Sequence, residues 1–323
     1  MAEANPLYPR PATVRRRLVP PVCLAAAALA LATACGKKAE PPPAKVPEPP
    51  PPAVELAPAA SPVEAPAPVT PAIDPLKNGW NLPPHGTTAK VGDRIFLLTQ
   101  GKDRSHTNPA AIYQLFAHDL GDVKGDVATI KELDGSSFQV GGQYIIAAGL
   151  QAASDVKAGD MVLAEWASSL KHAIVQKVEG DKITVRYTDL PDSWSEDKLV
   201  AVKSAREVTK QTEGLAPGNF AVAQDDGRSV IVLLVSENGD KWLARKFSGR
   251  VATFAKDDLQ AIPLKPTLKP GHAVTVPYVG MLYPGKVKKV SGTRVEVSID
   301  PGVSKEPIVS SLGQVSPAHP PAK

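Results

Sequence analysis

With 323 residues and a formal net charge of +4, the chain is long enough for several small domains. Its two cysteines exclude a disulfide framework or a thiolate metal cluster. Residues 1–34 hold four arginines and one glutamate, so the remainder has a net charge near +1 and lacks the basic face expected of a nucleic-acid-binding protein.

The N-terminus is predicted to be an export signal, residues 1–34. Three arginines at 15–17 precede an apolar run of 13 residues, 22–34, whereas a membrane-spanning helix needs about 20. The run ends in LATAC and resembles the lipobox of bacterial lipoproteins, which implies that Cys35 becomes the first mature residue and carries the lipid. Ala32 stands where that family usually has leucine, so cleavage by ordinary signal peptidase remains an alternative.

A proline-rich linker is predicted over residues 35–77. There are 14 prolines in the 37 positions from 39 to 75, a composition that favours disorder with an extended polyproline II path. At about 3.1 Å per residue such a segment would reach roughly 110 Å. We interpret it as a spacer; the alternative is a ligand for aromatic grooves, as other proline-rich segments are.

The folded part is predicted to consist of four β-rich units. The first, residues 78–152, opens with AKVGD at Gly92 and needs an insertion of roughly ten residues, placed at 99–108, to match the others. The second, residues 153–213, opens with VKAGD and has alternating apolar strands at 161–166 and 183–187, with a hairpin turn at Gly180. A capping box at Ser204 predicts a short linker helix after it.

The third and fourth units, residues 214–265 and 266–317, repeat this pattern. They open with LAPGN and LKPGH, and residues 318–323 form a tail predicted to be disordered. From the opening glycine to the leucine of the last predicted strand the distance is 40, 41 and 41 residues, ending at Leu199, Leu259 and Leu312. Constant spacing predicts a repeat architecture, and closing each short sheet into a barrel would remove its exposed edges.

The second unit resembles the Tudor/Agenet family of SH3-like barrels. The resemblance is good over residues 157–203, fair over 267–316, and weak over 214–263 and 86–150. It implies an all-β protein of tandem five-stranded small barrels. The matching residues are Gly159, Val162, Ala164, Trp166, Ala173, Val175, Val178, Val185, Tyr187, Asp189, Leu199 and Val202.

The same resemblance implies a binding face. Tudor domains that read methylated side chains hold a cation in an aromatic cage with an acid nearby. The matching positions here are Trp166, Tyr187, Asp189 and Trp194. The alternative is structural: Trp166 and Tyr187 would belong to the barrel core, and Trp194, in a polar stretch, would cover its rim.

We find no pattern typical of catalysis. None of the six histidines forms a metal-spaced pair, and neither a G-x-S-x-G motif nor a phosphate-binding loop occurs. The protein is therefore predicted to be no enzyme and to need no cofactor or metal. The cationic run at 286–289 is interpreted as the solvated face of a strand.

Two functions follow as hypotheses. The first is a non-catalytic envelope lipoprotein whose Tudor-like barrels form a binding or scaffolding arm. It would be anchored to a membrane, more plausibly the outer one, face the periplasm or the cell surface, and bind an envelope protein or a cell-wall polymer. The alternative is an envelope hydrolase or other enzyme with a site between barrels. A pocket with converging ionisable groups would favour the enzyme.

Overall fold

The computed structural model describes residues 74–101, 104–149, 152–190 and 194–317. These belong to one compact unit of the chain, Pro68–Lys323. The predicted signal, Cys35, nearly all of the proline-rich linker and the predicted tail lie outside the described residues. No helix within the described part is long and apolar enough to cross a membrane.

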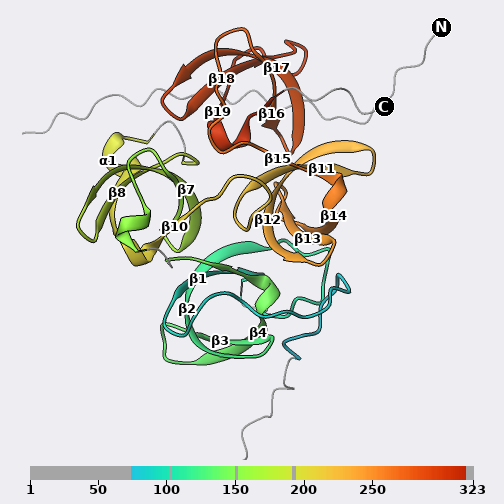
Figure 1. The fold of residues 1–323 in the computed structure, drawn as a ribbon. Helices are drawn as coiled ribbons and strands as arrows, with labels where there is room; N and C mark the ends of the chain where they lie inside the picture. The colour runs from blue at the N-terminus through green and yellow to red at the C-terminus, as the bar shows by residue number, and fades with distance from the viewer. Residues whose placement is uncertain (1–73, 102–103, 150–151, 191–193, 318–323) are drawn as a thin grey trace, which may run out of the picture. The chain divides into compact units, whose positions relative to one another are not determined.

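Twenty strands form four antiparallel barrels of five strands each (Figure 1). The first barrel comprises β1 (Arg94–Thr99), β2 (Gln114–Lys124), β3 (Val127–Lys131), β4 (Ser137–Gly141) and β5 (Ile145–Ala147). The second comprises β6 (Met161–Trp166), β7 (Ser169–Glu179), β8 (Lys182–Tyr187), β9 (Val200–Ser204) and β10 (Val208–Lys210). The third comprises β11 (Phe220–Asp225), β12 (Arg228–Asn238), β13 (Lys241–Lys246), β14 (Val251–Ala255) and β15 (Leu259–Ala261). The fourth comprises β16 (Ala273–Tyr278), β17 (Met281–Ser291), β18 (Arg294–Ile299), β19 (Ile308–Ser311) and β20 (Ser316–Pro317).

All four barrels share one strand order. Counted along the chain, the fourth strand pairs with the third, the third with the second, the second with the first, and the first with the fifth. A single 3-10 turn precedes the fifth strand in every barrel: Gly142–Tyr144, Ala205–Glu207, Lys256–Asp258 and Leu312–Gln314. This is the arrangement of an SH3-like barrel, so the predicted all-β fold of tandem five-stranded barrels is confirmed.

A repeated hydrogen-bonded pair opens each barrel. The N–H of the opening glycine donates to the carbonyl oxygen of a second-strand residue that comes just before a β-bulge. The N–H of this second-strand residue donates back to the carbonyl oxygen of the residue that follows the glycine. The N–O distances are 2.7–3.0 Å in all four barrels. The pairs are Gly92 with Leu120, Gly159 with Val175, Gly218 with Leu234 and Gly271 with Val287. Each glycine has a φ between 84° and 90°, which a residue with a Cβ adopts only at a cost.

This pair shows what is constant in the repeat. Glycine and partner are 16 residues apart in the last three barrels and 28 apart in the first. The first barrel therefore carries about twelve extra residues, and they lie between β1 and β2. The predicted insertion at 99–108 falls at the start of this connection.

The structure corrects the prediction that the closing leucine of each unit lies in its last strand. Leu199 comes before β9, the fourth strand of its barrel, whereas Leu259 opens β15, a fifth strand. The two leucines are not equivalent, because the connection from third to fourth strand has 12 residues in the second barrel and four in the third. The predicted linker helix is also wrong. The capping box at Ser204 is present, but it starts a single 3-10 turn that leads into β10 of the same barrel.

The barrels are joined through buried apolar surface. The core of the first barrel continues into Leu163 and Leu170 of the second barrel and into Leu233 and Val251 of the third. The second barrel is also bonded to the first by pairing of β2 with β7 at Phe116 and Ser169. The first three barrels are therefore not independent modules along the chain.

Two matched glycine variants test this junction. Gly218 and Gly271 occupy the same place in successive barrels and have φ values of 84° and 90°. A Cβ on Gly271 would meet nothing within 4 Å, whereas one on Gly218 would overlap Leu163 of the second barrel. Gly271→Ala should lower the stability by about 1 kcal/mol through backbone strain alone. Gly218→Ala should cost a further 1–3 kcal/mol or so through overpacking, measured by urea unfolding; equal losses would contradict the close contact.

Candidate functional site

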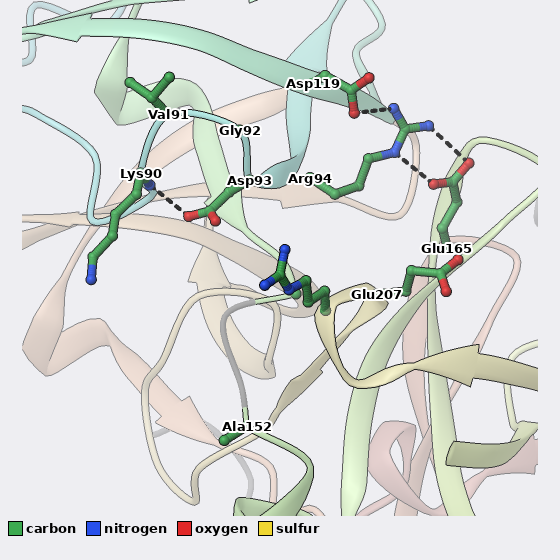
Figure 2. A pocket seen from close by; sticks show the side chains of 11 residues that line it. Lys90, Val91, Gly92, Asp93, Arg94, Asp119, Ala152, Glu165 and Glu207 are labelled. Carbon is green, nitrogen blue, oxygen red and sulfur yellow. Dashed lines mark hydrogen bonds and ion pairs between the residues drawn. The ribbon is translucent and has the colours of Figure 1, made fainter. Parts of the chain in front are cut away.

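A cleft of about 890 Å³ lies between the first and second barrels (Figure 2). One wall is the opening turn of the first barrel, from Lys90 to Arg94, with Asp119 of β2. The other wall is formed by the second barrel and includes Glu165 of β6, Arg206 and Glu207. The cleft therefore gathers four carboxylates and three cationic side chains from two barrels.

Arg94 holds the two walls together. Its Nε and Nη2 donate to the two carboxylate oxygens of Glu165 at 2.8 and 3.1 Å, and its Nη1 donates to Asp119 at 2.9 Å (Figure 2). Hydrogen bonding to Glu165 raises the pKa of Arg94, although burial opposes this. A planar guanidinium matches a carboxylate through two parallel bonds, so this contact fixes the relative orientation of both side chains.

Glu207 has a structural partner of its own. Its carboxylate accepts the N–H of Ser204 at 2.7 Å and completes the capping box of the 3-10 turn. Burial opposes its ionisation, but the hydrogen bonds from Ser204 and the positive charge of Lys203 outweigh that effect and lower the pKa of Glu207. Glu207 is therefore a carboxylate at neutral pH and does not serve as a general acid there.

The cleft has the chemistry of recognition. Lys90 and Arg206 are exposed on it beside the acidic residues, so it presents both signs of charge to a ligand. Within the described residues, no three histidine, cysteine, aspartate or glutamate side chains are grouped as a metal site would need. The ion pairs of Arg94 in the walls, with exposed Lys90 and Arg206 at the rim, suit a polar ligand that carries charge.

The structure brings only two of the four predicted cage residues together. The rings of Trp166 and Trp194 lie with centroids 4.7 Å apart, tilted by 53°. Both are half-buried against the second barrel's core, so Trp194 is not distinguished from Trp166 by exposure. The Lys198 ammonium lies 5.7 Å from the centre of the Trp194 ring and supplies a cation from the chain itself.

Tyr187 lies in the core of the second barrel. Its side chain is buried, and its hydroxyl donates to the carbonyl of Glu165 at 2.5 Å. Burial raises the pKa of this phenol above its ordinary value. Tyr187 therefore belongs to the barrel core and not to an aromatic cage.

Asp189 is bonded to His172. It accepts the His172 backbone N–H at 2.9 Å and lies 2.8 Å from His172 Nδ1, while His172 Nε2 lies 2.7 Å from the carbonyl oxygen of Gly218 in the third barrel. The His172 ring therefore lies between a carboxylate of its own barrel and a backbone carbonyl of the third barrel. Asp189 therefore helps to join the second and third barrels.

Sequence reasoning missed the residues of the cleft. Arg94 and Glu165 are 71 positions apart, and nothing in their local pattern indicates that they meet. The one available signal was the capping box, which was recognised at Ser204 but assigned to a linker. The capping box placed Glu207 at a helical turn. It could not show that this turn lies against the first barrel, which is what forms the cleft.

Comparisons with known proteins give little about this chain. No protein-family model matches it, and no curated protein does. One similar solved structure is a crystal structure of the four MBT repeats of Drosophila melanogaster Sfmbt with a methylated peptide. It is 9% identical, covers 71% of this chain and 88% of that chain, and has a TM-score of 0.16. So low a score supports no conclusion, and the fold assignment here rests on the strand pairing.

Removal of either partner of the His172–Asp189 contact should weaken the junction. His172→Ala leaves the Asp189 side chain without its ring partner, and we expect a loss of about 1–3 kcal/mol. Asp189→Ala should cost a similar amount, and the double variant should cost clearly less than the sum of the two. Urea unfolding of all three variants measures the coupling. Strict additivity would contradict a direct contact between the two side chains.

Glu207 should give stability a recognisable pH dependence. Its folded-state pKa is below the ordinary value of 4.5, so its contribution is present above that pH and is lost as the pH falls through the folded-state pKa. Glu207→Gln should therefore flatten the decline of the melting temperature below about pH 4.5. Glu306→Gln, at an exposed turn of the fourth barrel, is the control and should leave the profile unchanged.

Proposed function

We propose that this protein is a non-catalytic lipoprotein of the bacterial cell envelope, anchored through lipid on Cys35 in the outer membrane. Its tandem barrels would act as a binding or scaffolding arm for an envelope protein or a cell-wall polymer. The lipobox-like LATAC and the proline-rich segment support the anchor and the reach of the arm. The observation that carries the binding role is the cleft whose two walls are held by Arg94.

A binding role fits the state of the ionisable groups. Arg94 is paired with both Glu165 and Asp119, one cation with two carboxylates, and Glu207 accepts the Ser204 N–H of its capping box. These pairs leave the cleft walls rigid before any ligand arrives, which lowers the entropy lost on binding. Lys90 and Arg206 remain to contact a ligand directly.

The same cleft is the feature that favours the alternative, an envelope hydrolase. It gathers ionisable groups between two barrels, which is where a composite active site would form. A hydrolase would also need a proton donor or a nucleophile activated near neutral pH. The bonds made by Glu165 and Glu207 place both carboxylates in structural roles, so we favour binding.

Site-specific crosslinking distinguishes these functions. A photoreactive residue at Arg206 should capture one defined envelope component in intact cells, and Glu165→Gln, which loosens the wall, should reduce that product. The control is the same photoreactive residue at Lys305, an exposed turn position of the fourth barrel. Identical products from both positions, or none from Arg206, would count against binding at the cleft. Cleavage of the captured component would favour the hydrolase.

The anchor has its own test. Cys35→Ala should abolish lipid attachment and leave the protein unprocessed or released from the membrane fraction. Cys23→Ala, inside the predicted signal, keeps the lipobox and should behave as the wild type. Fractionation and mass spectrometry of the mature N-terminus measure both variants. Membrane association of an unlipidated, processed Cys35→Ala protein would contradict the lipoprotein assignment.

A further inference from the structure

A second groove, of about 360 Å³, lies where the first three barrels meet. Its lining includes β5 and β10, which are the fifth strands of the first and second barrels and belong to one ten-stranded sheet. Each of these strands pairs with one neighbour only, β5 with β1 and β10 with β6. The groove thus has two unpaired strand edges in its walls.

The register shows which backbone groups face outward. In β5, Ala148 donates to the Arg94 carbonyl, so Ile146 bonds to β1 and Ala147 points its backbone groups away from β1. In β10, Gln211 donates to Met161 and Thr209 lies opposite Leu163, so Lys210 points its N–H and C=O away from β6. In the described part of the chain, the N–H of Ala147 and both backbone groups of Lys210 have no protein partner.

The two edges are pinned at one end. The hydroxyl of Thr209 accepts the N–H of Gly149 at 2.7 Å and lies 3.5 Å from the Ala147 carbonyl oxygen. Gly149 is so close to the Arg206 carbonyl that no Cβ would fit. Beyond this contact the groove is lined by Gln211, Thr212 and the segment 85–88. The Thr209 hydroxyl therefore joins the two edges at this end.

The apolar surface of the groove comes from Ala147, Ala216 and Pro217, which are partly or fully exposed there. The charged side chains of the lining are paired, and Glu237 is bonded to Lys256 at 2.9 Å. Burial lowers the pKa of His85 despite the opposing charge of Asp126, so this ring is neutral at neutral pH. The Lys210 ammonium is paired with Asp160 at 3.0 Å. Gln211, itself 7% exposed, has a side-chain carbonyl oxygen without a hydrogen-bond donor among the described residues.

We infer that this groove binds a short extended segment of a partner polypeptide, which adds as a strand to the β10 edge. An extended chain offers N–H and C=O groups at the spacing of a strand edge, and its side chains alternate between two faces. One face would contact Ala147, Ala216 and Pro217, so it should carry small apolar side chains. Because the groove lining is largely neutral, the segment should be uncharged. This inference is independent of the anchor and of the ionic cleft.

The test uses the full chain and a defined probe. The probe is an acetylated and amidated pentapeptide of alternating threonine and valine, titrated into isotope-labelled protein. We expect saturable shifts of the backbone amide signals of Lys210 and Ala147. Two analogues, N-methylated either on the valines or on the threonines, remove donors from one edge at a time. At least one analogue should bind at least about tenfold more weakly.

A matched pair of variants separates backbone from side chain. Lys210→Pro removes an N–H that the sheet does not use, so the barrel should fold and the probe should bind at least about tenfold more weakly. Lys210→Ala loses the ion pair but keeps the N–H, so it measures the contribution of the side chain, and Lys210→Pro should bind at least about tenfold more weakly than Lys210→Ala. Absence of saturable shifts, shifts elsewhere, equal binding of both analogues, or unchanged binding to the folded Lys210→Pro variant would each overturn the inference. Equal binding of the analogues would assign the groove to an apolar ligand.

Discussion

The burial of apolar surface across barrel boundaries is the constraint on which the other features depend. A five-stranded unit of about fifty residues encloses few side chains and is marginal alone. Here the first barrel extends its core through Leu163 of the second barrel and Leu233 of the third. Because the first three barrels share this core, the cleft and the groove lie at their junctions.

The repeat is held together by a backbone device rather than by a set of side chains. In every barrel a glycine with positive φ donates its N–H to the carbonyl oxygen of the residue before the bulge. That residue donates its own N–H to the carbonyl oxygen of the residue after the glycine. The side chain after the glycine varies, from Asp93 to Asn219 to His272, because only its carbonyl is used. A bulge bends and twists the second strand, which lets so short a sheet close on itself.

Polar residues of the described part divide between holding the barrels together and lining the two sites that we propose for ligands. Asp189 and Tyr187, which the Tudor resemblance implied for a cage, make bonds that stabilise the barrel and its junction with the third barrel. Arg94 is ionised and largely satisfied by Glu165 and Asp119. What remains for recognition is exposed charge on the ionic cleft and unpaired backbone on the groove. Both arise only where barrels meet.

The sequence by itself determined the local structure. Alternating apolar residues placed β6 with its observed bounds and β8 to within one residue, and the four glycine openings marked the barrels, because turn chemistry and period-2 patterns are set by neighbours in the chain. It misplaced Leu199 and the turn after Ser204, since loop lengths between strands vary without a local signal. Only the tertiary structure decided that Arg94 meets Glu165 and His172 meets Gly218. The physical reason is that these contacts depend on how whole barrels pack, and the energy that packs them is non-directional burial of apolar surface.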